Sequence, residues 1–283
     1  MEMNFKFSLI MSTLNRTNEV SKFLDSLSRQ SYKNYELIIV DQNDDDRLKE
    51  TVDKYANICT EIIRLKSERG LSRGRNVGLA HASGDIIAFP DDDCNYPENL
   101  LKNVNEWFEQ NNDYAGVSGV SVGRDGNLSV GRFDNTSGDI DRLNIWNRMT
   151  SIGFFVKKSV VGNEIRFDEK LGVGSGTIYG AAEDIDFPLQ LLAHGNNLFF
   201  SPNLKITHPP VTIDYDSESR HRGLLYGGGI GYVLEKHKYP LKFVLKMLVR
   251  PLGGAIISIF LFNFAKAWFH WNVFRGRLRG MIQ

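Results

Sequence analysis

Residues 84–93 read GDIIAFPDDD, and this stretch constrains the fold more than any other. An apolar strand over residues 85–89 runs almost directly into three consecutive carboxylates, Asp91, Asp92 and Asp93. Neighbouring carboxylates repel one another, and more strongly where a buried strand reduces their solvation. A divalent cation relieves this repulsion, and oxygen ligands favour Mg²⁺ or Mn²⁺, which also bind phosphates. The alternative interpretation is a solvated acidic turn ahead of the helix that Pro97 begins.

The segments around this stretch alternate between strand and helix periods. Apolar runs predict strands over residues 7–11, 35–40, 61–65, 85–89 and 114–122, and helical spacing predicts helices over 20–27, 47–55, 71–82 and 97–108. This alternation predicts an α/β fold with a mostly parallel central sheet flanked by helices. In open sheets of this kind, ligands bind beyond the carboxyl ends of the strands. Those ends carry Thr13–Arg16, Asp41–Asn43 and Asp91–Asp93, so we expect a site where they converge.

The pattern is looser after residue 123. The stretch 123–141 is polar and contains several glycines, and we expect either an excursion of the chain or a mobile loop there. Local spacing predicts further strands over 153–157, 198–200 and 205–207, and helices over 183–193 and 217–239. The last of these helices is expected in spite of three consecutive glycines at 227–229.

Composition and charge narrow the class of protein. The chain has 283 residues, of which 42% are hydrophobic and 24% charged, so it can bury a substantial core. Its two cysteines, Cys59 and Cys94, make no disulfide framework and favour a reducing compartment. The net charge is zero, yet residues 241–283 hold seven bases and no acid. An acidic body joined to a basic, aromatic tail indicates an enzyme at an anionic surface, with no nucleic-acid partner.

Several segments together resemble the family 2 glycosyltransferases with the GT-A (Rossmann-like) fold, of the bacterial surface-polysaccharide type. They are FSLIMSTLNRTNEV (7–20), YELIIVDQN (35–43), GLSRGRNVG (70–78), GDIIAFPDDD (84–93), the acid pair Glu183–Asp184 and His208 after a short strand. The resemblance covers about residues 5–210. It implies inverting transfer of a sugar from a nucleotide diphosphate sugar, with a divalent cation, Mn²⁺ or Mg²⁺, as cofactor.

The resemblance also assigns roles to the residues at the strand ends. The residues expected to bind the nucleotide sugar are Thr13, Asn15, Arg16, Asp41, Arg75, Asn76, Asp91 and Asp92. Asp41 would accept the imide N–H of a uracil or thymine base, although Gln42 and Asn43 depart from the usual pattern and leave the base open. Asp93 would hold the metal, and Asp91 would face either the metal or the ribose. His208 is either a third metal ligand or a structural residue.

Two further residues are expected to act on the acceptor. Asp184, the second acid of its pair, would take the proton from the acceptor hydroxyl, a role that typically contributes about 10²–10⁴-fold to the rate. Glu183 would orient the acceptor. Alternatively, both acids simply stabilise the positive end of the helix that they open, which contributes about 0.3–1 kcal/mol.

The tail, residues 241–283, contains an uncharged run of 15 residues, Pro251–Ala265, which is shorter than the roughly 20 needed to cross a bilayer. Lys242, Lys246 and Arg250 are spaced as one polar stripe of a helix beside an apolar, aromatic face. This pattern predicts an interfacial amphipathic helix, or a pair of them, at the membrane surface. The alternative is packing on the enzyme's own core or on a second subunit in a homo-oligomer.

We expect two regions in the chain and one enzymatic function. Residues 1–215 would form the catalytic domain, with a nucleotide-sugar half over about 1–122 and an acceptor half over about 123–215, and residues 216–283 a membrane-associating helical region. The enzyme would extend a lipid-linked oligosaccharide for a capsule, O-antigen or exopolysaccharide, as a peripheral protein at the cytoplasmic face of the bacterial inner membrane. The rival functions are a nucleotide-sugar-binding or scaffold protein without activity, and a sugar nucleotidyltransferase.

Overall fold

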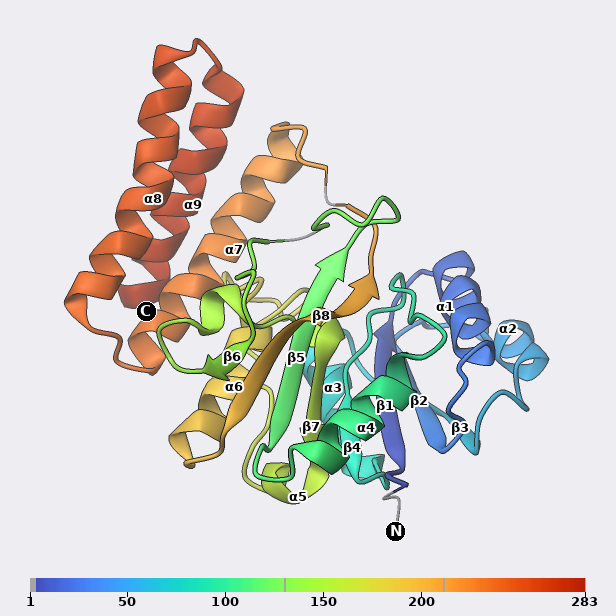
Figure 1. The fold of residues 1–283 in the computed structure, drawn as a ribbon. Helices are drawn as coiled ribbons and strands as arrows, with labels where there is room; N and C mark the ends of the chain where they lie inside the picture. The colour runs from blue at the N-terminus through green and yellow to red at the C-terminus, as the bar shows by residue number, and fades with distance from the viewer. Residues whose placement is uncertain (1–3, 130, 211, 283) are drawn as a thin grey trace. The chain divides into compact units, whose positions relative to one another are not determined.

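The computed structural model of the chain describes residues 4–129, 131–210 and 212–282 (Figure 1). Its contacts divide the chain into two compact units. The first comprises Met1–Arg69, Arg73–Arg166 and Gln190–Val211, and the second comprises Gly70–Ser72, Phe167–Leu189 and Thr212–Gln283. The predicted domains, with their boundary at residue 215, remain a prediction, and each unit is described by itself.

The first unit contains an eight-stranded sheet in the order β3-β2-β1-β4-β7-β5-β8-β6. Its strands are β1 (Phe7–Thr13), β2 (Tyr35–Asp41), β3 (Glu61–Lys66), β4 (Ile86–Ala88), β5 (Gly116–Val122), β6 (Gly138–Ile140), β7 (Phe154–Lys157) and β8 (Leu198–Thr207). Only β7 and β6 run against the direction of the other six. The predicted mostly parallel sheet is therefore confirmed.

Two details of the sheet differ from the prediction. The segments 198–200 and 205–207 belong to one continuous strand, β8, because a register shift between Ser118 and Val120 of β5 keeps the two strands paired. The short edge strand β6 lies inside the stretch that was expected to be an excursion of the chain or a mobile loop, where it pairs with the start of β8.

Helices cover both faces of this sheet. One face is packed by α1 (Asn18–Ser28) and α4 (Leu100–Gln110), whose apolar stripes join the alternate residues Phe7, Leu9 and Met11 of β1 in one core. The other face is packed by α3 (Leu71–His81), which lies behind the sheet in Figure 1. The shorter helices of this unit are α2 (Lys49–Lys54), α5 (Lys158–Val161), η1 (Ile145–Asn147) and η2 (Ser151–Gly153).

The glycines of the GLSRGRNVG segment bring α3 against β1. A Cβ atom on Gly78 would lie 2.3 Å from Cγ2 of Ile10, and one on Gly74 would lie 2.5 Å from Oγ of Ser12. Only a residue without a side chain permits this approach. The close packing fixes Arg75, which lies between the two glycine positions, beneath the carboxyl end of the sheet.

The second unit is mainly helical. It contains the first seven residues of α6 (Glu183–Ala193), together with α7 (Ser217–Lys236), α8 (Leu241–Phe260) and α9 (Phe264–Ile282). Helix α9 packs on both α7 and α8 (Figure 1). Among the described residues, Leu241–Phe260 is the one helix with the length and mean hydropathy, 1.7, of a membrane-crossing segment.

Interlocked glycines join α7 to α9. A Cβ atom on Gly276 of α9 would lie 2.1 Å from the carbonyl oxygen of Leu224 in α7, and one on Gly231 of α7 would lie 2.1 Å from the carbonyl oxygen of Arg277. The two backbones therefore touch at this crossing. This contact explains why a glycine-rich segment forms the helix that the sequence predicted, since the packing offsets the low helix propensity of glycine.

The hydrogen bond that a proline removes from α8 is replaced by one from an arginine of α9. Pro251 has no N–H to donate to the carbonyl of Met247, four residues earlier in the helix. The guanidinium of Arg277, from α9, donates to that carbonyl instead. Arg277 is buried, and this burial, reinforced by the nearby charge of Arg250, lowers its pKa to about 10.

We expect Gly276→Ala to lower the free energy of unfolding by about 1–3 kcal/mol, because the new methyl group meets backbone that cannot move aside. Gly253→Ala is the matched control in α8, where a Cβ atom would meet nothing within 4 Å. The control should be neutral or stabilising by about 0.5–1 kcal/mol. Chemical denaturation of the full chain measures both, and equal effects of the two substitutions would contradict the proposed helix crossing.

Candidate functional site

The carboxyl ends of the strands bring the predicted site residues of the first unit together. Thr13 and Asp41 are paired neighbours at the ends of β1 and β2. After β4 the chain turns through Asp91–Asp93, and Asn95 then exchanges two backbone hydrogen bonds with Thr207, at the end of β8. That bridge places His208 beside the acidic turn, although 115 residues separate His208 from Asp93.

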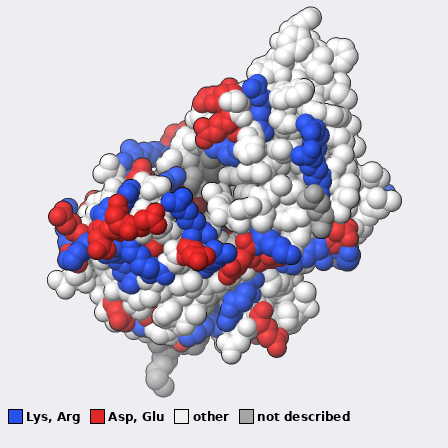
Figure 2. All heavy atoms as spheres, turned by 180° about the vertical axis from the view of Figure 1, so that it is seen from behind, with Lys and Arg blue, Asp and Glu red and all other residues white. Residues whose placement is uncertain are grey.

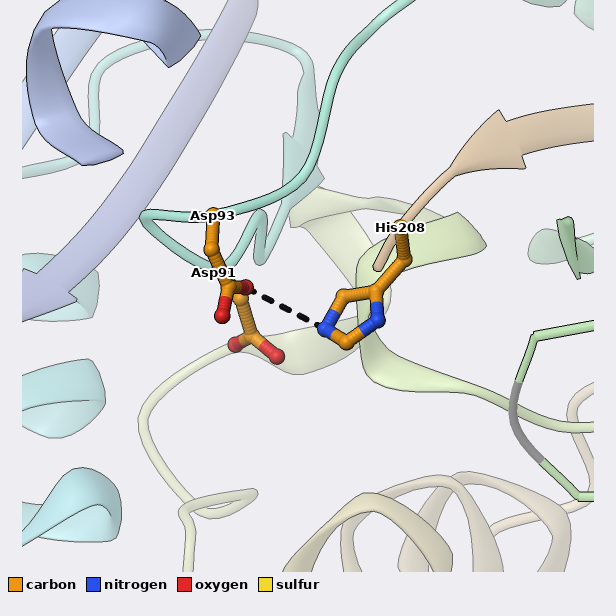
Figure 3. A group of neighbouring side chains, drawn as sticks. All are labelled: Asp91, Asp93 and His208. Carbon is orange, nitrogen blue, oxygen red and sulfur yellow. Dashed lines mark ion pairs between the residues drawn. The ribbon is translucent and has the colours of Figure 1, made fainter. Parts of the chain in front are cut away.

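Asp91, Asp93 and His208 form a candidate metal centre. One ligand atom from each lies within 4.8 Å of the others. Figure 3 shows the imidazole of His208 pointing toward the two carboxylates, with its Nε2 atom 3.1 Å from Oδ1 of Asp93. Two carboxylates and one imidazole suit Mn²⁺, and Mg²⁺ with more water ligands. The donor set therefore fits the predicted cofactor.

The three aspartates have different environments. Asp92 is buried, which raises its pKa to about 6, although Oγ of Thr13 donates to it at 2.6 Å. Burial also favours the neutral form of Asp93, but hydrogen bonds from His208 and Arg16 outweigh it and bring the pKa down to about 2. Asp93 is thus an anion at neutral pH, as a metal ligand must be.

The charges around this turn are paired. Arg16 donates to Asp92 at 2.8 Å and to Asp93 at 2.5 Å. Burial disfavours a charged imidazole, yet the hydrogen bond and charge of Asp93 raise the pKa of His208 above its usual value. A cation bound here would therefore displace a proton from His208 and compete with Arg16 for Asp93.

Arg75 is a buried part of the site. Its side chain is 2% exposed, and its guanidinium donates to Asp91 and to Oγ of Ser151, both at 3.1 Å. Arg75 is therefore a buried charge of the site and does not lie on the surface of α3. Ser151, in η2, was missed, and no signal in the sequence connects it to Asp91. Asn76, the next residue of α3, is half-buried, and its role remains a prediction.

Asp41 is enclosed by its neighbours. Its oxygens accept hydrogen bonds from the backbone and side chain of Asn43 and from Arg64, and Lys66 lies 3.0 Å away. These partners outweigh burial and lower the pKa of Asp41. Arg64 and Lys66 were missed, although their spacing on β3 places both on the face beside Asp41.

Asn43 has a second role at this edge of the sheet. Its side-chain oxygen accepts the backbone N–H of Asn15 at 2.7 Å, and Asn15 has a left-handed conformation with a φ of 60°. The Asp41-Gln42-Asn43 sequence, which departs from the resembled family's usual pattern, thus fixes the loop that carries Arg16. Binding of a base by Asp41 and of a nucleotide by Asn15 remains a prediction.

Glu183 and Asp184 belong to the second unit. They open α6, where Glu183 is buried and Asp184 is half-buried. Their proposed roles toward the acceptor remain predictions. Asp186 was missed: it is fully buried and paired with Lys236 at 2.9 Å and with His237 at 2.7 Å. These pairs tie α6 to the end of α7.

A cleft of about 1300 Å³ opens beside Asp93. The outer side of α1 and the loop Gly123–Ser129 line it, together with residues at the end of β8. A volume of this size can hold a ligand as large as a nucleotide or a short saccharide. The cleft therefore gives solvent and ligands access to one side of the candidate metal centre.

Comparison with known proteins agrees with this arrangement. The sequence profile of Glycosyl transferase family 2 matches residues 8–165, more than half of the chain. The GalNAc(5)-diNAcBac-PP-undecaprenol beta-1,3-glucosyltransferase of Campylobacter jejuni is 29% identical over 186 residues, which is 62% of this chain and 58% of that protein. Across the first three curated relatives, the chain spans from 15% to 58% of the relative's length.

Solved structures show the same fold. The mannosyltransferase PcManGT of Pyrobaculum calidifontis, in complex with GDP-Man and Mn²⁺, is similar with a TM-score of 0.66 at 15% identity, over 99% of this chain and 88% of that one. Residues 1–349 of TarS from Staphylococcus aureus, in complex with UDP-GlcNAc, give a TM-score of 0.61 at 17% identity, over 97% and 91%. These likenesses confirm the predicted GT-A fold.

We expect His208→Ala to weaken binding of Mn²⁺ by about 10–100-fold, because it removes the one imidazole of the cluster. Isothermal titration with MnCl₂ measures this. His194→Ala is the matched control, since His194 is an exposed histidine of the same unit that lies 3.7 Å from Glu164. Unchanged Mn²⁺ affinity in the His208 variant would mean that this residue is structural.

Proposed function

The chain belongs to glycosyl transferase family 2, and we propose that it moves a sugar from a nucleotide diphosphate sugar to a hydroxyl of a lipid-linked saccharide, with inversion at the anomeric carbon. The observation that carries the proposal is the cluster of Asp91, Asp93 and His208 at the carboxyl ends of the strands. That is where open α/β sheets bind their ligands.

Asp91, Asp93 and His208 would hold Mn²⁺ or Mg²⁺. Such a cation supplies Lewis acidity that stabilises the charge growing on a departing diphosphate, a contribution of several kcal/mol. Arg75 donates to Asp91 and so orients this ligand. Arg16 lies against Asp92 and Asp93, and its guanidinium would be close to a diphosphate bound at this cation.

For the donor we propose a uridine nucleotide sugar. A carboxylate at position 41 can accept the imide N–H of uracil, and the TarS structure with UDP-GlcNAc supports this choice by fold similarity. Asp41 has no exposed surface and is contacted by Asn43, Arg64 and Lys66, so a base reaches it only when these neighbours rearrange. The PcManGT structure with GDP-Man supports the general class of donor but a different base.

Asp184 is the proposed general base, and Glu183 would orient the acceptor. Inversion in one displacement needs a base on the face opposite the leaving group, and a carboxylate can accept that proton. The half-buried position of Asp184 at the start of α6 is compatible with this role. Both acids also complement the positive end of the helix, and the two roles are compatible.

The proposed acceptor is linked to a membrane lipid. The Campylobacter jejuni relative is named for an undecaprenol diphosphate substrate, and a WfgD relative from Escherichia coli, 28% identical over 99 residues, is named for a diphosphoundecaprenol substrate. We place the protein at the cytoplasmic face of the inner membrane, in synthesis of a capsule, O-antigen or related surface polysaccharide. The basic tail, residues 241–283, would make the membrane contact.

Titration of the protein with UDP-GlcNAc and UDP-glucose tests the donor and the metal together. We expect Mn²⁺ to tighten binding of at least one of them by tenfold or more, and slow release of UDP to follow on prolonged incubation. Chelation with EDTA should reverse both effects. Equal binding with and without the metal would contradict the metal-dependent mechanism, and binding without any UDP release would favour the non-enzymatic alternative.

We expect Asp184→Asn to reduce transfer by about 10²–10⁴-fold while leaving donor affinity within about twofold, because the amide cannot accept the acceptor proton. The matched control is Glu218→Gln, which removes an exposed acid from the first turn of α7. Donor binding by titration and sugar transfer by nucleotide release are measured on the same preparations. Loss of both properties in parallel would remove the general-base assignment.

A further inference from the structure

We infer that the connection between α8 and α9 inserts into the acyl region of an anionic bilayer, tip first, as a helical hairpin. The hairpin tip is defined here as residues 256–264. The inference rests on the proposed function only for the choice of a membrane as the partner. Residues 256–264 would enter the lipid, and Lys266 would stay at the headgroups.

The hairpin tip exposes a concentration of large apolar side chains. They are Ile256, Ile257, Ile259, Phe260, Leu261, Phe262 and Phe264, which are between 47% and 81% exposed. The free end of the hairpin carries neither Lys, Arg, Asp nor Glu in Figure 2. These apolar side chains surround the end of the hairpin, so a flat partner surface would cover only one side of it. The acyl chains of a bilayer can cover all sides and remove more apolar surface from water.

Several polar groups of the tip, including three backbone N–H groups, are hydrogen-bonded within the hairpin. Ser258 is buried and donates to the carbonyl of Gly254 at 2.7 Å, and the side-chain oxygen of Asn263 accepts the N–H of Lys266 at 3.1 Å. The backbone N–H groups of Leu261, Phe262 and Asn263 donate to the carbonyls of residues 257, 259 and 258, respectively. Hydrocarbon tolerates backbone only when it is hydrogen-bonded internally, and these donors meet that condition.

Basic residues set the depth of insertion. Lys266, close to the tip on α9, is half-buried, and its Nζ atom lies 5.9 Å from the ring centre of Tyr215. The long side chain of Lys266 keeps its charge among the headgroups when the tip enters by about 5–10 Å, the usual depth of interfacial segments. Deeper insertion would bury this charge in hydrocarbon. Arg250 lies ten residues before Phe260, or about 15 Å along the helix, and so remains outside the hydrocarbon.

Charge favours lipid over a second copy of the chain. Residues 241–283 carry seven bases and no acid, so pairing two tails would bring like charges together. An anionic headgroup layer attracts the same bases, and each basic residue near the surface strengthens membrane binding by about fivefold. A membrane-crossing α8 would have to carry Lys242, Lys246 and Arg250 into or across the bilayer, with α9 packed beside it.

Vesicle flotation of the full chain tests the inference without any sugar nucleotide. The tip variant is Phe260→Ser with Phe262→Ser, and the matched control is Leu241→Ser, which alters a residue 72% exposed at the other end of α8. On phosphatidylcholine vesicles that contain phosphatidylglycerol, we expect the tip variant to lose at least tenfold in binding and the control to stay within twofold. Removing phosphatidylglycerol should weaken the unaltered protein by at least tenfold.

Equal loss in the tip variant and the control would mean that the hairpin lies flat, and no loss in either would mean that another surface binds. Either result overturns tip-first insertion. Because binding is measured without donor or acceptor, failure here leaves the transferase proposal standing, and failure of transfer leaves this result standing.

Spin labels provide a second, independent readout of depth. A nitroxide is attached to Phe262→Cys or to Leu241→Cys in a chain with Cys59→Ser, since the remaining Cys94 is buried. On vesicles, relaxation of the label at 262 should respond more to oxygen than to a water-soluble nickel chelate, and the label at 241 should show the reverse. A label at 262 that stays in water, or one that is reduced by ascorbate trapped inside the vesicles, would overturn the inference.

Discussion

Repulsion among three adjacent carboxylates is the constraint on which the candidate site depends. The fold answers it with cations and donors from elements distant in the sequence: Arg16 after β1, Arg75 from α3 and His208 after β8. Each is delivered by a different feature of the architecture. Strands β1 and β4 are parallel neighbours, so their carboxyl ends lie at the same edge of the sheet. The glycines of α3 allow this helix to approach β1 closely. The bridge between Asn95 and Thr207 ties the end of β8 to the acidic turn.

This arrangement explains why the three aspartates are not equivalent. Asp92 is buried against Thr13 and Arg16 and behaves as a structural acid, with a pKa raised to about 6. Asp91 and Asp93 point toward His208 and are available to a cation. The three residues lie in a tight turn, closed by a hydrogen bond from the N–H of Cys94 to the carbonyl of Asp91, so their side chains point in different directions. Asp92 therefore supports the turn through Thr13 and Arg16, whereas Asp91 and Asp93 lie beside His208.

Much of this was predictable from the sequence, for reasons that differ between elements. The buried strand YELIIV and the stripe of α1 are local patterns, so their elements and burial followed directly. The contact between His208 and Asp93 is not local, and only the resemblance to a family suggested it. Arg64, Lys66, Ser151 and Asp186 were missed because their importance depends on pairings across strands and helices. The glycine-rich helix α7 was predicted, but its close packing against the backbone of α9 was not, because that contact is not local.

The proline in α8 also links two positions that lie 26 residues apart. Arg277 is useful where it is because Pro251 leaves the Met247 carbonyl without a donor. A chain with an ordinary residue at 251 would supply that donor itself, and the buried guanidinium would then become a burden. The proline and the arginine therefore depend on each other, because each is tolerated in its place through a hydrogen bond to the same carbonyl group.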